Sequence, residues 1–130
     1  MKANYKIFWG LAIALVLVLG MQQLQAADGV DVKQAQSMSQ HGALLIDVRE
    51  PEEYAGGHAP NAKLIPLGQL SSRLQEISYY KDKPIVVMCH SGRRSAIAVS
   101  QLQAAGFTQV SNVRGGMTAW ESDGLAVVKM

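Results

Sequence analysis

The chain has 130 residues, of which 48% are hydrophobic and 17% charged, and its formal net charge is +2. This length suits one ordinary domain, and the composition predicts a packed core and excludes a disordered chain. The small net charge gives no support for nucleic-acid or polyanion binding, which usually needs a strongly basic surface. The chain has one cysteine, Cys89, which excludes an intramolecular disulfide.

Residues 1–26 have the composition of a secretory signal peptide. Lys2 and Lys6 flank a polar start, an apolar or small-residue run of 15 residues covers 7–21, and small residues suitable for cleavage follow. The alternative is an uncleaved membrane anchor, but a helix needs about 20 residues to cross a bilayer. We expect export to a bacterial periplasm, with one domain over 27–130, and anchoring in the inner membrane as the alternative.

Cleavage would remove Lys2 and Lys6 and leave 10 basic residues against 10 acidic ones. The mature domain would then be formally neutral, so any preference for anions must be local. We therefore expect no nucleic-acid partner, and contact with a membrane only if the N-terminal segment is retained.

Segments typical of helices and strands alternate from Asp31 onward. Asp31 is a good N-cap for a helix over 32–40, and Gly42 can end it. Further helical segments are predicted at a turn from Pro51, at 67–77, at 94–105 and at 117–122, and strands at 43–48, 62–66, 85–88 and 110–113. This alternation predicts a single α/β domain, with a mainly parallel sheet flanked by helices on both faces.

Apolar spacing indicates which residues these elements bury. Strand 85–88 is apolar throughout, which predicts burial on both faces. Tyr54 and Trp120 are expected to pack in the core or at its rim. Spacings of three and four predict two inward helix stripes, formed by Leu67, Leu70, Leu74 and Ile77 and by Ile97, Ala98, Leu102 and Ala105.

Cys89 directly follows strand 85–88. In a parallel α/β sheet, the active site lies beyond the carboxyl ends of the strands. A lone cysteine is often a small buried hydrophobic residue, but in an oxidising compartment an unpaired thiol is open to oxidation. The position of Cys89 therefore makes it a candidate nucleophile.

The loop that begins at Cys89, CHSGRRS over 89–95, has the features of an anion-binding loop. A strand–loop–helix turn can point its backbone N–H groups inward, and the helix N-terminus adds partial positive charge. Gly92 allows backbone conformations that other residues adopt poorly. The two arginines are permanent cations, and the serine after them can cap the helix. These features favour a thiolate, so the pKa of Cys89 should lie below that of a free thiol.

With these residues the sequence resembles the rhodanese family of sulfurtransferases, specifically its small single-domain exported type. The likeness covers roughly residues 30–128. The family commonly has isoleucine and glycine where this chain has Ala59 and Asn61, and we expect only local turn changes there. The matching motifs, in family order, are LLIDVREPEEY (44–54), GHAPNAKLIP (57–66), IVVMCHSGRRS (85–95), AAGF (104–107) and VRGGMTAW (113–120) with Gly124.

The resemblance implies a ping-pong mechanism that needs no metal or cofactor. The Cys89 thiolate would attack the outer sulfur of thiosulfate, release sulfite and hold the sulfur as a persulfide, which a thiol or cyanide would then remove. Backbone N–H groups of residues 90–94 would stabilise the persulfide, and Arg93 or Arg94 would bind the sulfonate end of the donor. The candidate substrate- and anion-binding residues are His90, Ser91, Gly92, Arg93, Arg94 and Ser95.

Other functions are compatible with the same loop. Phosphatases of the related cell-cycle family and arsenate reductases of this fold also place a cysteine and an arginine around an anion. The phosphatase form resembles Cys-x5-Arg, whereas Cys89 and Arg94 form Cys-x4-Arg, and this tighter loop favours sulfur transfer. A non-enzymatic persulfide carrier or binding module is the remaining alternative, although a docking role alone would not need an intact cysteine and basic loop.

Asp47 and Arg49 are candidate supporting residues. If the strands are parallel, strand 43–48 ends at the same edge of the sheet as Cys89. Asp47 is expected either to pair with an arginine of the Cys89 loop or to cap the turn at 49–53. Arg49 could add to a cationic rim, but an exposed surface position is the simpler expectation.

The three histidines are assigned different environments. His58 lies in a Gly-rich turn where the family motif has a histidine for structural reasons, so we expect packing rather than catalysis. His90 is expected either to line the mouth of the site or to lie on the surface, and His41 to be exposed at a helix end. The histidines and Cys89 lack the spacing of metal ligands, so no zinc site is expected.

Overall fold

The structure is a computed structural model that describes residues 29–130. The leader predicted over residues 1–26 lies outside the described residues. Within the described part of the chain, no helix is both long and apolar enough to cross a membrane.

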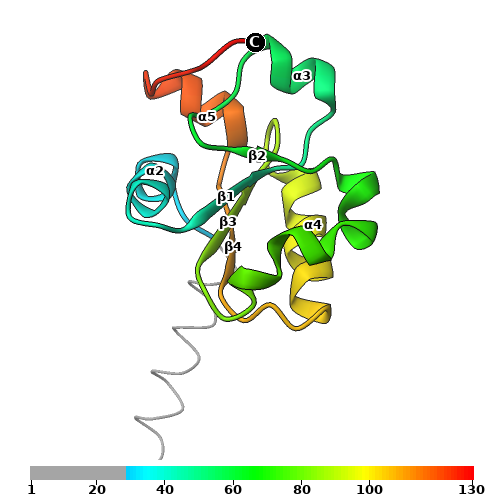
Figure 1. The fold of residues 1–130 in the computed structure, drawn as a ribbon. Coiled ribbons are helices and arrows are strands. Elements are labelled where there is room, and N and C mark those ends of the chain that lie inside the picture. Colours follow the sequence, from blue (N-terminus) through cyan, green and yellow to red (C-terminus); the bar gives the residue numbers. More distant parts are fainter. Residues whose placement is uncertain (1–28) are drawn as a thin grey trace, which may run out of the picture.

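Within residues 29–130, four parallel strands form one sheet in the order β2-β1-β3-β4 (Figure 1). Leu44 lies opposite Ile85, and Ile85 lies opposite Val110, so the three neighbouring strands start in register. The strands therefore end at one edge of the sheet, which confirms the predicted parallel arrangement. They are β1 (Leu44–Asp47), β2 (Lys63–Leu64), β3 (Ile85–Met88) and β4 (Val110–Asn112).

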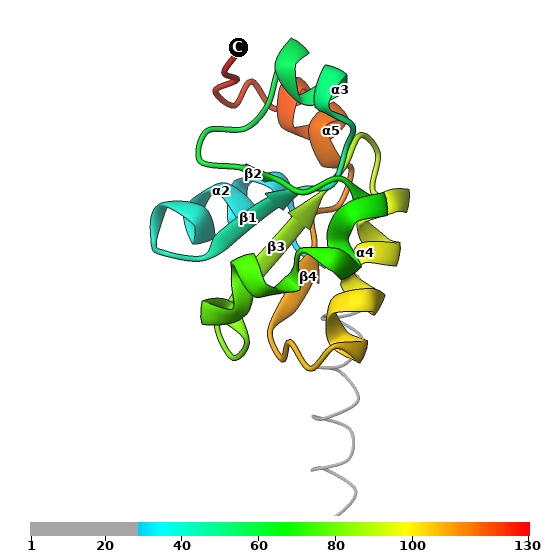
Figure 2. The ribbon, with the colours of Figure 1, turned by 45° about the vertical axis from the view of Figure 1, so that its right-hand side comes forward.

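Helices cover both faces of the sheet, as predicted (Figures 1 and 2). One face carries α2 (Val32–Gln40) and α5 (Gly116–Ser122). The other face carries α4 (Arg93–Ala104) and the 3₁₀ helices η1 (Leu67–Ser72) and η2 (Leu74–Tyr80). The short helix α3 (Pro51–Gly56) lies beyond the carboxyl ends of the strands.

Strand β3 divides the core into two parts. Ile85 and Val87 pack towards α4, η1 and η2, whereas Val86 and Met88 pack towards α2 and α5. All four side chains are fully buried, which confirms the burial predicted from the apolar run. A strand held on both faces fixes the position of the residue that follows it, and that residue is Cys89.

Two details of the helices differ from the prediction. The stripe over 67–77 is two 3₁₀ segments that meet at Arg73, because contacts spaced by three residues serve a 3₁₀ helix as well as an α-helix. Ile97 is 48% exposed instead of facing inward. Ala98 and Leu102 do face the core, and a step of one residue turns a side chain by about 100° around the helix.

Candidate active site

Cys89 lies at the carboxyl end of β3, where the loop to α4 begins. Its Sγ accepts a hydrogen bond from the Gly92 N–H at 3.1 Å and lies 3.4 Å from the Ser95 Oγ. Cys89 is 1% exposed and Ser95 is fully buried. The sulfur is therefore enclosed by its own loop and the first turn of α4, with hydrogen-bond donors directed at it.

Helix α5 holds the loop in this shape. The carbonyls of Cys89 and His90 accept hydrogen bonds from the N–H groups of Met117 at 2.8 Å and Thr118 at 3.0 Å. Because these carbonyls point towards α5, the N–H groups of the loop can turn towards the sulfur. Gly92, with a φ of 113°, adopts the left-handed conformation that this turn requires.

The loop favours the negative form of the sulfur. Burial raises the pKa of the Cys89 thiol, but the hydrogen bonds that the Ser95 side chain and the N–H groups of Ser95, Gly92 and Ser91 can give to the thiolate together lower it by more. The resulting pKa lies below the ordinary value for cysteine, in the predicted direction. The thiolate is the nucleophilic form of cysteine, so this direction is the one that a nucleophilic Cys89 would need.

The two arginines of the loop have different surroundings. Arg94 forms a two-pronged ion pair with Glu53 of α3, at 2.7 and 2.9 Å. The Arg94 guanidinium lowers the pKa of Glu53 to about 2, so the carboxylate stays charged and paired at neutral pH. The hydrogen bond to Glu53, and to a smaller extent the charge on Cys89, holds the pKa of Arg94 above its usual value. Arg93 is exposed and has no ion-pair partner among residues 29–130.

Asp47 and Arg49 lie at the same edge of the sheet as Cys89, but they pair with each other. The Arg49 Nη2 lies 2.8 Å from the Asp47 Oδ2, and the Arg49 backbone N–H donates to the Asp47 Oδ1 at 3.0 Å. The predicted pairing of Asp47 with an arginine of the Cys89 loop is therefore wrong. The alternative, in which Asp47 caps the turn that begins at Arg49, agrees with the structure. The surface position expected for Arg49 was also wrong, because Arg49 is 5% exposed and also donates to the Gly57 carbonyl. A buried carboxylate needs a cation, and Arg49 is near enough in sequence to supply it.

We predict that Arg49→Met lowers the free energy of unfolding by about 3–5 kcal/mol, because it leaves the fully buried Asp47 carboxylate without its cation. Urea denaturation followed by circular dichroism measures this change. Arg73→Met is the matched control, because Arg73 forms an ion pair with Glu76 on the surface, and it should change stability much less. Equal losses in the two variants would contradict a structural role for the buried pair.

The histidines lie in three environments. His58 is buried, stacks on Tyr54 with ring centroids 3.6 Å apart, and its backbone pairs with Val128. These contacts are structural ones. His90 is exposed beside Cys89, with its Nε2 3.5 Å from the Thr118 Oγ1, and His41 is exposed where α2 ends. Among residues 29–130, no group of three or more His, Cys, Asp or Glu side chains could hold a metal ion.

Comparison with known proteins identifies the family. The sequence model of the rhodanese-like domain matches residues 31–123. The chain belongs to this family. Its relatives include a sulfurtransferase of Allochromatium vinosum, which is 41% identical over 65% of this chain and 78% of the relative. A thiosulfate sulfurtransferase of Pseudomonas syringae is 33% identical over 69% of this chain and 83% of the relative.

Other relatives of this rhodanese-like domain differ in length and description. A putative sulfur carrier protein of Bacillus subtilis is 42% identical, and the match spans 58% of this chain but only 40% of that protein. Among solved structures, a rhodanese-related protein from Thermoplasma volcanium has a TM-score of 0.71 at 29% identity, covering 78% of this chain and 98% of that one. A polysulfide-sulfur transferase homodimer from Wolinella succinogenes has a TM-score of 0.68 at 30% identity, covering 88% and 89%.

The structure of the rhodanese-like domain adds three residues to the site that the sequence analysis did not identify. Glu53 binds Arg94, although 41 residues separate them. Gly116 lies so close to the loop that a Cβ there would be 2.7 Å from the His90 carbonyl oxygen. Asn112 accepts a hydrogen bond from Ser95 at 2.6 Å. Only the double glycine at 115–116 gave a local signal, because paired glycines often mark a close backbone approach.

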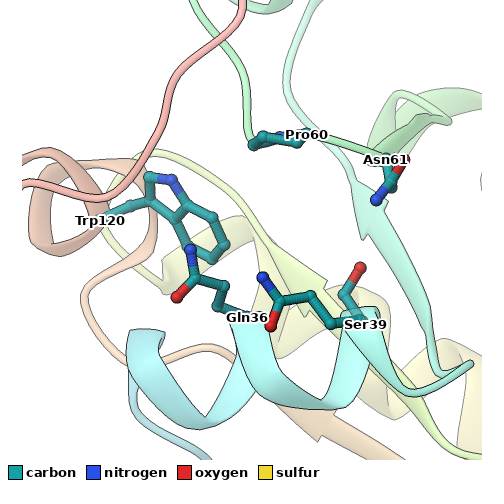
Figure 3. Close-up of a pocket in the computed structure, with 6 residues that line it drawn as sticks. Gln36, Ser39, Pro60, Asn61 and Trp120 are labelled. Atoms are coloured by element: carbon teal, nitrogen blue, oxygen red, sulfur yellow. The ribbon is translucent and has the colours of Figure 1, made fainter.

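A small pocket of about 40 Å³ lies away from the Cys89 loop, between α2 and the turn at Asn61 (Figure 3). Asn61 has a φ of 66°, a conformation that glycine and asparagine adopt most readily. The departure of this rhodanese-like domain from the family's glycine at Asn61 is therefore compatible with the local turn. The pocket is lined by Gln36, Ser39, Gln40, Pro60, Asn61 and Trp120, with no residue of the loop 89–95.

Proposed function

We propose that this protein is a sulfurtransferase that moves the sulfane sulfur of thiosulfate to a thiophilic acceptor, a thiol or cyanide, through a persulfide on Cys89. The observation that carries the proposal is the set of N–H groups directed at the Cys89 sulfur, with the Gly92 N–H at 3.1 Å. Such donors stabilise negative charge on sulfur, which the reaction needs before and after transfer. The thiosulfate sulfurtransferase among the relatives supports thiosulfate as the donor.

The first half of the reaction balances without a cofactor. The Cys89 thiolate attacks the outer sulfur of thiosulfate, the new bond forms between the two sulfurs, and sulfite leaves with the electron pair of the broken S–S bond. Cys89 then carries a persulfide with one negative charge. Because Cys89 is 1% exposed, a single added sulfur atom suits its surroundings better than a bulky group.

The second half returns the enzyme to its starting state. A thiolate or cyanide acceptor attacks the outer sulfur of the persulfide, the bond to Cys89 breaks, and Cys89 leaves as a thiolate. The loop donors that stabilised the first thiolate stabilise this one as well. A domain that only carries sulfur would form the persulfide and would lack catalysed turnover.

Steady-state assays separate the proposed activity from its alternatives. We expect thiocyanate formation from thiosulfate and cyanide, with the parallel reciprocal plots of a ping-pong mechanism. Phosphatase and arsenate reductase assays on the same protein should show no activity, since four residues rather than five separate Cys89 from Arg94. Hydrolysis of phosphate esters without sulfur transfer would reverse the assignment. Persulfide formation without turnover would favour the carrier.

We predict that Arg94→Ala raises the KM for thiosulfate about tenfold, because it removes a cation near Cys89 and leaves the Glu53 carboxylate unpaired close to the anionic donor. Adding Glu53→Gln to this variant should recover part of the loss. His58→Ala should change KM much less, because its contacts are structural. Kinetics of the three variants test this ranking, and a larger KM effect at His58 than at Arg94 would refute these roles.

A further inference from the structure

The hydrogen bonds beneath Cys89 fix the orientation of the Asn112 side chain. Asn112 lies at the carboxyl end of β4, opposite Val87 in the neighbouring strand. Its Nδ2 donates to the Gly92 carbonyl oxygen at 3.2 Å, and a carbonyl oxygen can only accept. The amide nitrogen must therefore face Gly92, and the amide oxygen must face Ser95.

This orientation determines where the proton of Ser95 goes. The Ser95 Oγ lies 2.6 Å from the Asn112 Oδ1, and an amide oxygen can only accept. The single hydroxyl proton of Ser95 is therefore donated to Asn112. The Ser95 Oγ also lies 3.4 Å from the Cys89 Sγ, so in this arrangement it offers the sulfur only its lone pairs.

We propose that Asn112 is a positioning residue that competes with Cys89 for the proton of Ser95. While Cys89 is a thiol, Ser95 donates to Asn112 and can accept the S–H proton. When Cys89 becomes a thiolate, Ser95 can donate to it only by giving up Asn112. Because Ser95 is fully buried, no bulk water replaces the bond that is lost.

The competition affects both ends of the catalytic cycle, a consequence that rests on the proposed sulfur transfer. Asn112 makes the resting thiolate less stable than the loop alone would, and a less stabilised thiolate is a stronger nucleophile. When the acceptor attacks the outer sulfur, negative charge returns to the Cys89 Sγ. Ser95 then turns from Asn112 to the departing thiolate, and it turns back once the next persulfide forms.

Alkylation of Cys89 tests the competition without reference to sulfur transfer. Cys89 is the only cysteine in the chain, so the rate of reaction with iodoacetamide reports on it alone. The rate is measured against pH and divided by its alkaline plateau, which removes differences in access. The proteins compared are the wild type, Asn112→Ala, Ser95→Ala and the double variant.

Asn112→Ala should raise the normalised rate in the wild-type protein but not in the Ser95→Ala protein. Asn112→Ala frees the Ser95 hydroxyl, so the normalised rate near pH 6 should rise roughly threefold to tenfold and the profile should move to lower pH. With Ser95→Ala already present, Asn112→Ala should produce no such rise. A fall in rate in both backgrounds would show that Asn112 only supports the loop, and an equal rise in both would exclude a route through Ser95.

One further variant, and the size of the effect in Ser95→Ala alone, keep the test decisive. Asn112→Leu retains the bulk of the side chain and should move the profile in the same direction as alanine. Ser95→Ala alone should change the normalised rate by less than about threefold, because the bond lost to the thiolate is offset by release from Asn112. A tenfold fall in Ser95→Ala would overturn the proposal, even if the Asn112 variants failed to fold.

Charged groups near the loop remain the same in all these variants. The pH profile can therefore be compared between them without a change in charge. The charged and titratable groups at this end of the sheet are His90, Arg93 and Arg94 from the loop and α4, Glu53 from α3 with the N-cap residue Glu50, and the Asp47–Arg49 pair at the end of β1.

Discussion

Cys89→Ala is expected to lower sulfur transfer from thiosulfate by more than about a thousandfold, because the proposed reaction passes through a covalent bond to this sulfur. No other thiol can form this bond, since Cys89 is the only cysteine in the chain. The measurement is the rate of thiocyanate formation with saturating thiosulfate and cyanide.

Circular dichroism and thermal unfolding provide the control for this variant. Cys89 packs with the apolar cluster between the sheet and α4, so loss of the sulfur should lower stability only moderately. Cys89→Ser, which keeps the size of the side chain, should be equally inactive. A folded Cys89→Ala protein that retained a tenth of the wild-type rate would refute the role of this residue.

Gly116→Ala should reduce activity at least about a hundredfold, because displacement of catalytic groups by an ångström has effects of this size. A Cβ at residue 116 would overlap the Cys89 carbonyl oxygen and lie 2.7 Å from that of His90. The φ of 53° adds strain for any side chain. The loop would have to move away from α5, and its N–H groups would no longer point at the sulfur.

Gly68→Ala is the matched control for this change. Gly68 lies in η1, and a Cβ there would meet no atom within 4 Å. We expect Gly68→Ala to leave activity near the wild-type value, while Gly116→Ala also lowers the free energy of unfolding by about 1–3 kcal/mol. Normal activity in Gly116→Ala would show that contact between α5 and the loop does not shape the site.

Much of the fold follows from local sequence patterns. The apolar run at 85–88 predicts β3, and Asp31 predicts the start of α2, because burial and capping depend on residues close together in the chain. The position of Cys89 then follows from the parallel sheet. Ile97 was misplaced because a spacing rule gives the width of an apolar face poorly, and residues at its border can turn to solvent.

Local sequence patterns could not predict the residues that support the Cys89 loop from other elements. Glu53 and Arg94 meet only because α3 and the start of α4 lie at the same sheet edge. Asn112 reaches Ser95 across 17 positions, from a strand whose neighbour is known only once the sheet order is known. The leader predicted over residues 1–26 stays a prediction.

Intact-mass measurement of the protein with thiosulfate shows whether Cys89 takes up sulfur. We expect the mass to increase by one sulfur atom, the added sulfur to map to Cys89, and cyanide to remove it as thiocyanate. Cys89→Ala treated in the same way should gain nothing. An unchanged mass for the folded wild-type protein, or an equal gain in Cys89→Ala, would contradict sulfur transfer through Cys89.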